Sequence, residues 1–326
     1  MVVIILVVVA GFSVWQFFGQ KQLPQVTAPL DSVRLSAYLG EFSGLIWVAE
    51  NKGYFKDNGL DVKITERQSG VDALNDIFAG NADISTQAEF VAVSQSFKRN
   101  DFKILASIDS ISAIYMVGLK DHNINQIRDL KGKKIGVTQN SQAQFFLGKF
   151  LVDNNLKLSD VQIVYLKPAD MVAGMEAGSI DAAVTWQPLV SQIEDKPGIS
   201  AIKWLAQSNR QFSFLLTASN DLVKNKPQVV ERFLKALVQA ENVSDAEKEK
   251  IIKTRLKYQD AYMQKIWPNN VYLVTLNQGL LTLMKDEAQW MMENKITDSK
   301  AMPNFLDYVY FNGLETADPG AVTIVH

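Results

Sequence analysis

The chain has 326 residues, more than one hydrophobic core usually holds, so two lobes or domains are expected. Its 33 basic residues nearly balance its 35 acidic ones, and no basic stretch is interleaved with aromatic residues, which argues against a nucleic-acid partner. The chain contains no cysteine and only 2 histidines. This composition excludes disulfides and Cys-ligated metals, and it predicts no metal, no cofactor and no catalytic residue.

The N-terminal element is an almost unbroken apolar run at residues 2–18, with aromatic residues at its far end. Such a run is typical of a membrane-targeting segment, and the aromatic residues suit the membrane interface. We expect residues 1–20 to be a membrane anchor or a cleaved signal segment, and we favour the anchor because a cleavage site is poorly marked. Residues 21–31 are expected to form a linker, and the residues after them are expected to be periplasmic or otherwise extracytoplasmic.

From residue 32 onward, short β-branched runs alternate with amphipathic ones, which predicts an α/β fold with right-handed crossovers. The predicted strands occupy residues 33–38, 61–66, 82–85, 103–107, 113–119, 134–138, 162–166, 182–185 and 212–217. The predicted helices between them occupy residues 45–51, 71–79, 89–99, 142–154, 169–177 and 188–193. From residue 220 to about residue 294 the pattern is almost wholly helical, and alternating charges at 247–255 predict a solvated helix face.

Two segments of the chain, residues 70–84 and 168–184, share one pattern. Each is a helical run that ends in glycine and is followed by a small turn and an Asp that enters a strand. Gly80 and Gly178 suit the position just after the helix end, where a positive φ costs a glycine nothing. The repetition predicts two similarly built lobes.

A candidate ligand site lies in residues 129–147, which predict a lysine-rich turn, a buried strand and the polar start of an amphipathic helix. Asn140 or Ser141 is a good N-cap residue for this helix. The unpaired N–H groups and the dipole of its first turn favour a carboxylate, sulfonate, phosphate or polar atom. The lysines of the turn, at 131, 133 and 134, precede the strand, so we expect them to be solvated at the opposite edge of the sheet.

Four runs, at residues 49–62, 73–84, 129–137 and 177–188, together resemble the periplasmic substrate-binding proteins of ABC importers for nitrate, alkanesulfonates, taurine and thiamine pyrimidines, the SsuA/THI5-like family. The resemblance covers roughly residues 33–240 in the expected order. It implies a two-lobed periplasmic-binding-protein fold of type II, in which each lobe is a mixed sheet flanked by helices. One small molecule is expected in the cleft, with hinge closure around it.

On this resemblance, residues 32–112 form lobe 1, residues 113–211 form lobe 2, and residues 212–326 return to lobe 1 with C-terminal helices. The family's ligand contacts lie in loops that follow strands, as expected for open α/β sheets. Carried over to this sequence, the ligand-binding positions are Tyr38, Gly40, Glu41, Gln68, Ser69, Gly70, Thr86, Gln87, Ser112, Asn140, Ser141, Gln142, Ala143, Trp186 and Gln187.

Four further side chains bear on the ligand. Trp186 could stack on it or anchor the core of a lobe, and Trp47 could form the floor of the site or pack in the core. Glu41 and Asp109 fall near the ends of predicted strands and could bind an amine, although a lone loop acid is usually solvated. Together with the helix start at Asn140, such a carboxylate favours a ligand with one anionic or polar end and one cationic end.

The leading prediction is a monomeric, non-enzymatic solute-binding protein, anchored to the inner membrane by residues 2–18. It captures a sulfonate, a taurine-like compound or an aminopyrimidine and delivers it to an ABC permease. One alternative is a membrane-tethered ligand-sensing module, because the same fold serves either purpose. A second alternative is a thiamine-pyrimidine synthase-like enzyme. It is disfavoured because the synthases that resemble this family rely on a cysteine-rich iron motif and a reactive histidine, and the chain has no cysteine and no histidine before residue 122. The identity of the ligand stays open at this point.

Overall fold

The computed structural model describes residues 29–208 and 210–325. The predicted membrane segment at residues 2–18 and most of the predicted linker lie outside these ranges. Within them, no helix has both the length and the apolar character that a membrane crossing requires. The chain divides into residues 1–30 and a second unit of residues 31–326, which is the part described below.

The first sheet of this unit has six strands in the order β11-β4-β10-β3-β1-β2. These strands are β1 (Asp31–Tyr38), β2 (Leu60–Arg67), β3 (Ile84–Ala88), β4 (Phe102–Ile111), β10 (Phe212–Ser219) and β11 (Asn270–Val271). Strand β1 is parallel to β2 and β3, whereas β10 is antiparallel to β3 and β4. The sheet is therefore mixed, as predicted.

The second sheet has five strands in the order β7-β6-β8-β5-β9. These strands are β5 (Tyr115–Leu119), β6 (Lys134–Val137), β7 (Gln162–Tyr165), β8 (Ala182–Thr185) and β9 (Ala201–Leu205). Strand β6 is parallel to β7 and β8, and β5 is antiparallel to β8 and β9. The order and directions match those of the first sheet, with β6, β7, β8, β5 and β9 in the places of β1, β2, β3, β10 and β4. The internal repetition predicted from the sequence is thus a repetition of sheet topology.

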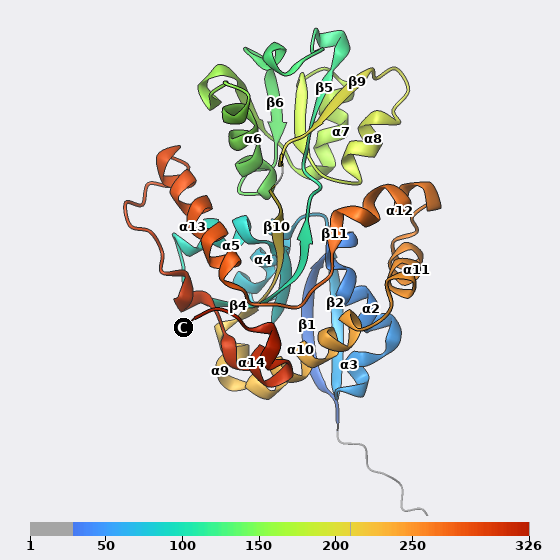
Figure 1. The fold of residues 1–326 in the computed structure, drawn as a ribbon, viewed down its shortest axis with the longest axis vertical. Helices are drawn as coiled ribbons and strands as arrows, with labels where there is room; N and C mark the ends of the chain where they lie inside the picture. The colour runs from blue at the N-terminus through green and yellow to red at the C-terminus, as the bar shows by residue number, and fades with distance from the viewer. Residues whose placement is uncertain (1–28, 209, 326) are drawn as a thin grey trace, which may run out of the picture. The chain divides into compact units, whose positions relative to one another are not determined.

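The chain passes from the first sheet to the second after β4 and returns before β10 (Figure 1). The two connections lie side by side, because Ala206 donates its N–H to the carbonyl of Ile114 at 2.8 Å and Gln207 accepts the N–H of Ile114 at 2.7 Å. The predicted lobe boundaries, after residues 112 and 211, fall in these connections. A pair of adjacent connections is the usual arrangement for hinge closure of two lobes.

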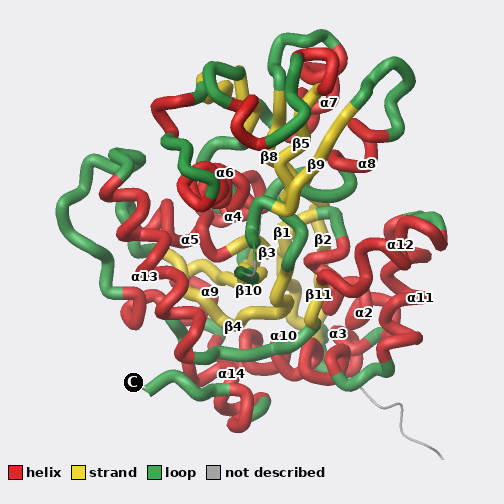
Figure 2. The backbone as a smooth tube through the Cα atoms, turned by 45° about the horizontal axis from the view of Figure 1, so that its top comes forward, coloured by secondary structure: helices red, strands yellow, loops and turns green. Residues whose placement is uncertain are grey.

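Helices cover both sheets. Those that follow strands are α2 (Gly44–Lys52), α3 (Tyr54–Asp57), α4 (Gly70–Phe78), α5 (Glu89–Ser96), α6 (Gln142–Asp153), α7 (Pro168–Glu176) and α8 (Leu189–Glu194). The C-terminal helices are α9 (Asn220–Asn225), α10 (Pro227–Glu241), α11 (Asp245–Leu256), α12 (Asp260–Ile266), α13 (Gln278–Glu293) and α14 (Phe311–Ala317). Figure 2 shows α5 and α13 together on one side of the first sheet and α2, α3 and α11 together on the other.

Local sequence signals mark the ends of two of these helices. Gly80 and Gly178 follow the ends of α4 and α7 with φ values of +71° and +65°, which confirms the predicted role of both glycines. All nine predicted strands are present, with ends that differ by a few residues. The sequence analysis missed β9 and β11, because β9 is a half-buried edge strand without clear alternation and β11 has only two residues.

A tight contact joins α6 to α13. A methyl group at Gly148 would lie 2.7 Å from Cε2 of Trp290, and the Trp290 ring packs edge-on against Phe145 and Phe90. The missing side chain at Gly148 therefore lets the indole lie against the backbone of α6, which connects the C-terminal region to the helix that follows β6.

We predict that Gly148→Ala lowers the free energy of unfolding by about 1–3 kcal/mol, because the methyl group would overlap the indole. Alanine is otherwise favoured over glycine inside a helix by about 1 kcal/mol, so a loss of stability would identify the overlap. Denaturant unfolding measures the change, and Val152→Ala on the exposed side of α6 is the control. Greater stability in Gly148→Ala would contradict the contact.

Candidate functional site

A cavity of about 40 Å³, called the inner pocket here, is lined by residues at or near the ends of strands of both sheets. Its walls include five aromatic side chains, those of Tyr38, Phe42, Trp186, Phe212 and Phe214. None of the described residues that line it is charged. The inner pocket is thus a neutral, mostly apolar site that can exclude water.

Three helices begin at the inner pocket. Ser69 and Gly70 at the start of α4, Ala88 before α5, and Ser141 and Gln142 at the start of α6 all line it. The Ser69 hydroxyl accepts the N–H of Asp72 and so caps α4, whereas α5 and α6 have no side-chain cap. Because helix N-termini favour negative charge, the pocket can hold an anionic or strongly polar head group without a cationic side chain.

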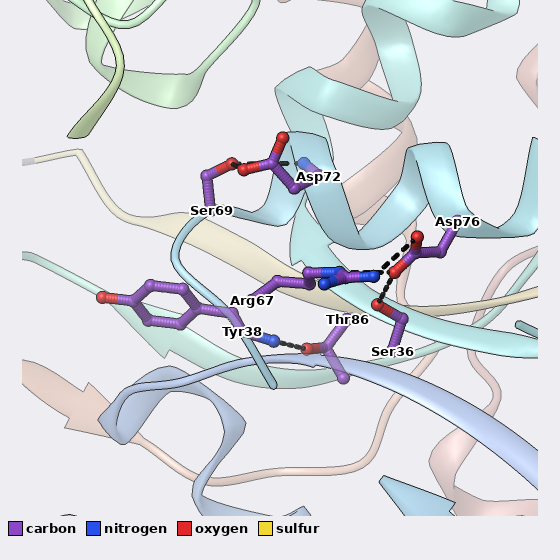
Figure 3. Close-up of polar contacts among 7 residues, drawn as sticks. All are labelled: Ser36, Tyr38, Arg67, Ser69, Asp72, Asp76 and Thr86. Carbon is purple, nitrogen blue, oxygen red and sulfur yellow. Dashed lines mark hydrogen bonds and ion pairs between the residues drawn. The ribbon is translucent and has the colours of Figure 1, made fainter. Parts of the chain in front are cut away.

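Gly70 packs closely against Gln87. A methyl group there would lie 2.7 Å from Cβ and 2.8 Å from Cα of Gln87, so only glycine lets α4 start this close to β3. Figure 3 shows Ser69 beside Asp72 at this helix start. The close approach brings the first turn of α4 to the end of β3, where α5 begins.

A polar network supports the ends of β1 and β2 from inside the first lobe (Figure 3). The Arg67 guanidinium pairs with Asp76 at 2.6 Å, and the hydroxyl of Ser36 donates to the same carboxylate at 2.6 Å. The bond from Arg67 holds the pKa of Asp76 below its ordinary value. Since this guanidinium is already paired, the network positions the strand ends and does not bind an anion.

A larger cavity of about 460 Å³, called the outer chamber here, is also lined from both sides. Tyr38 and Trp186 line both cavities and therefore form the boundary between them. The outer chamber also contains the amide of Gln68 and the cations Arg255 and Lys257. Its volume lies in the range of small-molecule sites.

One hydrogen bond connects the two lobes at this boundary. The Tyr38 hydroxyl, at the end of β1, donates to the main-chain carbonyl of Gln187, just after β8, at 3.1 Å. The main-chain N–H of Tyr38 donates to the Thr86 hydroxyl at 3.0 Å, which fixes the base of the ring. Tyr38 is thus held from its own lobe and contacts the opposite one.

The structure brings seven of the fifteen predicted ligand-binding residues to the two cavities. These are Tyr38, Gln68, Ser69, Gly70, Ser141, Gln142 and Trp186. Trp186 is 7% exposed; it lines both cavities and also packs in the hydrophobic core. Trp47, by contrast, is fully buried and donates its indole N–H to the carbonyl of Gly40 at 2.8 Å, so it is a core residue.

The other predicted residues lie around the cavities without lining them, and several have internal partners. Thr86 is bonded to Tyr38 and to Ser43, and the Gln87 amide donates to Thr217 at 3.1 Å. The N–H of Ser112 donates to the carbonyl of Asn269 at 3.0 Å. Gly40, Ala143 and Gln187 contribute backbone or buried packing.

The start of α6 differs slightly from the prediction. Ser141 is the N-cap residue, but its hydroxyl donates to the carbonyl of Thr138 at 2.6 Å and does not cap the helix. Asn140 precedes it with a φ of +56°, and its N–H donates to the amide of Gln144 at 2.7 Å. Asn140 is therefore a turn residue beside the site.

The structure does not bring the predicted amine-binding acids to the ligand cavities. Glu41 is 1% exposed and accepts a hydrogen bond from the Tyr258 hydroxyl at 3.0 Å, and Asp109 is fully buried and accepts the N–H of Val271 at 2.8 Å. Burial raises the pKa of Glu41 to about 7 and raises that of Asp109 well above its ordinary value. Neither acid lines the inner pocket or the outer chamber.

Sequence reasoning missed other lining residues. Phe212 and Phe214 are two positions apart on β10, so a strand places both rings on one face, and this signal was present in the sequence. Arg255 was assigned to a solvated helix face. It instead lies over the Trp47 ring at 4.6 Å and pairs with Glu50 and Glu66.

Comparison with known proteins gives the family. The NMT1/THI5-like family model matches residues 41–245. The chain belongs to the NMT1/THI5-like family. This result confirms the resemblance noted in the sequence.

Three relatives illustrate the range of the family. A Brucella abortus (strain 2308) protein assigned as a binding protein is 28% identical over 236 residues, which cover 68% of this chain and 70% of the relative. A Bacillus subtilis (strain 168) protein assigned as an aliphatic sulfonates-binding protein is 30% identical over 203 residues, covering 59% and 60%. The taurine-binding periplasmic protein of Escherichia coli (strain K12) is 24% identical over 192 residues, covering 58% and 59%.

Two further matches bear on fold and chemistry. The alkanesulfonate-binding protein SsuA from Xanthomonas axonopodis pv. citri, solved with MOPS bound, superposes with a TM-score of 0.73 at 16% identity and covers 87% of this chain and 99% of its own. This likeness shows the two-lobed periplasmic-binding-protein fold. The 4-amino-5-hydroxymethyl-2-methylpyrimidine phosphate synthase of Aspergillus parasiticus is 24% identical over 219 residues, 60% of each chain, so an enzyme also occurs among the relatives.

Gly40 leads to a prediction about the site. A methyl group there would lie 2.7 Å from Cζ of Tyr38, so Gly40→Ala should displace the ring and break its bond to Gln187. We expect the free energy of unfolding to fall by about 1–3 kcal/mol, measured by denaturant unfolding.

A double-mutant cycle with Tyr38→Leu isolates the cause of this loss. If the ring is responsible, Gly40→Ala should cost little in the Tyr38→Leu background, because the overlapping group is gone. An equal loss in both backgrounds would show that Gly40 acts through something other than Tyr38.

Proposed function

We propose that the protein is an extracytoplasmic solute-binding protein that captures a small organic anion, foremost a sulfonate, between its two lobes and delivers it to an ABC permease. The observation that carries the proposal is the convergence of three helix N-termini, of α4, α5 and α6, on one neutral pocket lined from both lobes. Relatives that bind aliphatic sulfonates and taurine support the choice of anion.

The inner pocket suits the head group of such a ligand. The first-turn N–H groups of the helices supply hydrogen-bond donors, and the helix dipoles offset the negative charge in a site from which aromatic rings exclude water. A cavity of about 40 Å³ accommodates only a few heavy atoms. The head group of the ligand is therefore proposed to lie in the inner pocket.

The organic part of the ligand is proposed to lie in the outer chamber, beyond Tyr38 and Trp186. That cavity is about 460 Å³ in volume and combines apolar walls with the amide of Gln68, the cation of Lys257 and the paired charges of Glu66 and Arg255. Its size favours a ligand larger than a two-carbon sulfonate. A sulfonate with a ring or a polar tail would use both cavities.

The proposed mechanism is closure without chemistry. Among the described residues the inner-pocket walls contain no Cys, His, Lys, Asp or Glu, so no such base is there to activate the hydroxyls of Ser69 and Ser141. The ligand would contact both lobes only in the closed form, which it stabilises by its greater affinity for that form. The bond between Tyr38 and Gln187, which joins the two lobes, supports this mechanism.

The same proposal includes a location outside the cytoplasm, a membrane tether at residues 2–18 and a monomeric state. The tether rests on the apolar sequence of residues 2–18, and the location also agrees with the taurine-binding relative, which is periplasmic.

We predict that alkanesulfonates raise the thermal stability of the purified protein and that inorganic sulfate does so less. A ligand present at 100 times its dissociation constant adds about 2.7 kcal/mol. A series from methanesulfonate to hexanesulfonate, with taurine and MOPS, should show affinity rising with the size of the organic part. Stabilisation by carboxylates alone, or by no anion of the series, would refute the sulfonate proposal.

We further predict that Trp186→Leu weakens sulfonate binding about tenfold or more, because the ring forms a wall of both cavities. Calorimetric titration measures the dissociation constant. Trp204→Leu on β9 is the matched control, since Trp204 lines neither cavity and is half-buried. Equal loss in the two variants would mean that the effect is on folding and not on the site.

A further inference from the structure

Three helices meet beside the inner pocket and are joined by one side chain. Gln142, the first residue of α6, is 3% exposed and lines the pocket. Its amide oxygen accepts the N–H of Phe90 in α5 at 3.3 Å, and its amide nitrogen donates to Oε1 of Glu287 in α13 at 2.8 Å. Gln142 thus bonds both α5 and α13 from the opposite lobe.

Two fully buried carboxyl groups meet at this junction. Glu89, the first residue of α5, accepts the N–H of Ser213 through Oε2 at 2.9 Å, and Glu287 accepts from Gln142 through Oε1. The two groups contact each other, and each has one further buried oxygen, Oε1 of Glu89 and Oε2 of Glu287, without another partner. Two carboxylates in such a place would leave these oxygens unpaired and would repel each other.

A single proton between these two oxygens would pair both of them. All four carboxyl oxygens would then have a partner, namely the Ser213 N–H, the Gln142 amide and the shared proton. With one oxygen bonded to Gln142 and the other to the shared proton, the Glu287 carboxyl group would be held in one orientation. It would then keep the amide nitrogen of Gln142 toward Glu287 and the amide oxygen of Gln142 toward the Phe90 N–H.

The electrostatics of the junction agree with retention of a proton. The pKa of Glu287 is raised to about 8 in all: burial is the main cause and the charge of Asp286 adds to it, whereas the bonds from Gln142 and Glu89 and the charge of Lys149 act in the opposite direction. Burial, and then the charge of Glu287, raise the pKa of Glu89 well above its ordinary value. The charged groups of α6 and α13 that face the pair are thus Lys149 and Asp286, and β10 contributes only the Ser213 N–H.

We propose that Glu89 and Glu287 share a proton and act as positioning residues, which fix Gln142 at the inner pocket and hold α6 against α5 and α13. The proposed contact between the lobes depends on the shared proton and needs no ligand. The proposed effect of this contact on ligand affinity rests on the proposed function.

The direction of the pH dependence follows from the raised pKa values of both groups. The folded protein binds more protons than the unfolded chain at every pH between the ordinary carboxyl pKa and the raised values. The contribution of the pair to stability is therefore complete in acid and falls as pH rises, and the contact between the lobes is lost at alkaline pH, when the last proton leaves the pair.

Glu287→Gln is the decisive variant, because a carboxamide can accept from Gln142 and donate to Glu89 without a titratable proton. We predict that butanesulfonate affinity in the unmodified protein is steady from pH 6 to pH 8 and falls about tenfold by pH 10. In Glu287→Gln it should change less than about twofold over the same range. Glu89→Gln, which can accept from Ser213 and donate to Glu287, should behave in the same way and serves if Glu287→Gln fails to fold.

Asp286→Asn is the matched control, since it removes one charge from the exposed neighbour on the same helix and leaves the pair intact. It should lose affinity with pH as the unmodified protein does. The proposal would be overturned if butanesulfonate affinity in Glu287→Gln fell with pH as it does in the unmodified protein. It would also be overturned if Asp286→Asn removed that fall.

Two measurements need no ligand. In carbon-13 spectra of the glutamate carboxyls, the signal that disappears in Glu287→Gln should titrate above neutrality. The chain has no cysteine, so Val152→Cys on α6 and Lys235→Cys on α10 accept a fluorophore pair that should separate above pH 8 in the unmodified protein and not in Glu287→Gln.

These results separate the two proposals. If no sulfonate binds at any pH while the carboxyl titration and the fluorophore separation behave as expected, the proposed function fails and the inference stands. If Glu287 titrates in the ordinary range of a glutamate, the inference fails whether or not sulfonates bind.

Discussion

A helix that follows a parallel strand presents its first N–H groups at the carboxyl edge of the sheet. In this protein β2, β3 and β6 each lead into such a helix, and the starts of α4, α5 and α6 all reach the inner pocket. Because these donors belong to the backbone, the pocket can attract an anion while its side chains remain neutral and aromatic. The packing of Gly70 against Gln87 and the paired Arg67 below it keep these helix starts in place.

The same arrangement explains how charge is distributed around the site. Arg67 is paired with Asp76, and Arg255 is paired with Glu50 and Glu66, so both cations are balanced before a ligand arrives. The buried acids Glu41, Asp109, Glu89 and Glu287 all have raised pKa values and are held behind the cavities. The described residues of the inner walls therefore carry no free charge.

The junction of α5, α6 and α13 connects the inner pocket to the C-terminal region of the chain. Trp290 packs on Gly148 and Phe145, and Gln142 bonds both Phe90 and Glu287. The helix that opens onto the pocket is therefore oriented by residues almost 150 positions away. Substitutions in α13 are expected to change the geometry of the site without touching the ligand.

The sequence by itself determined the alternation of strands and helices, the repeated unit whose helix ends at Gly80 and at Gly178, and the junction at Ser141 and Gln142, because these depend on local periodicity and backbone preference. The tertiary structure alone decided which polar residues meet. Gln87 and Thr86 turn into the lobe, Glu41 is buried beneath Tyr258, and Glu287 reaches Gln142, since such contacts depend on packing between distant segments. Local pattern records which residues are apolar, but it does not record which partner each buried polar group finds in the fold.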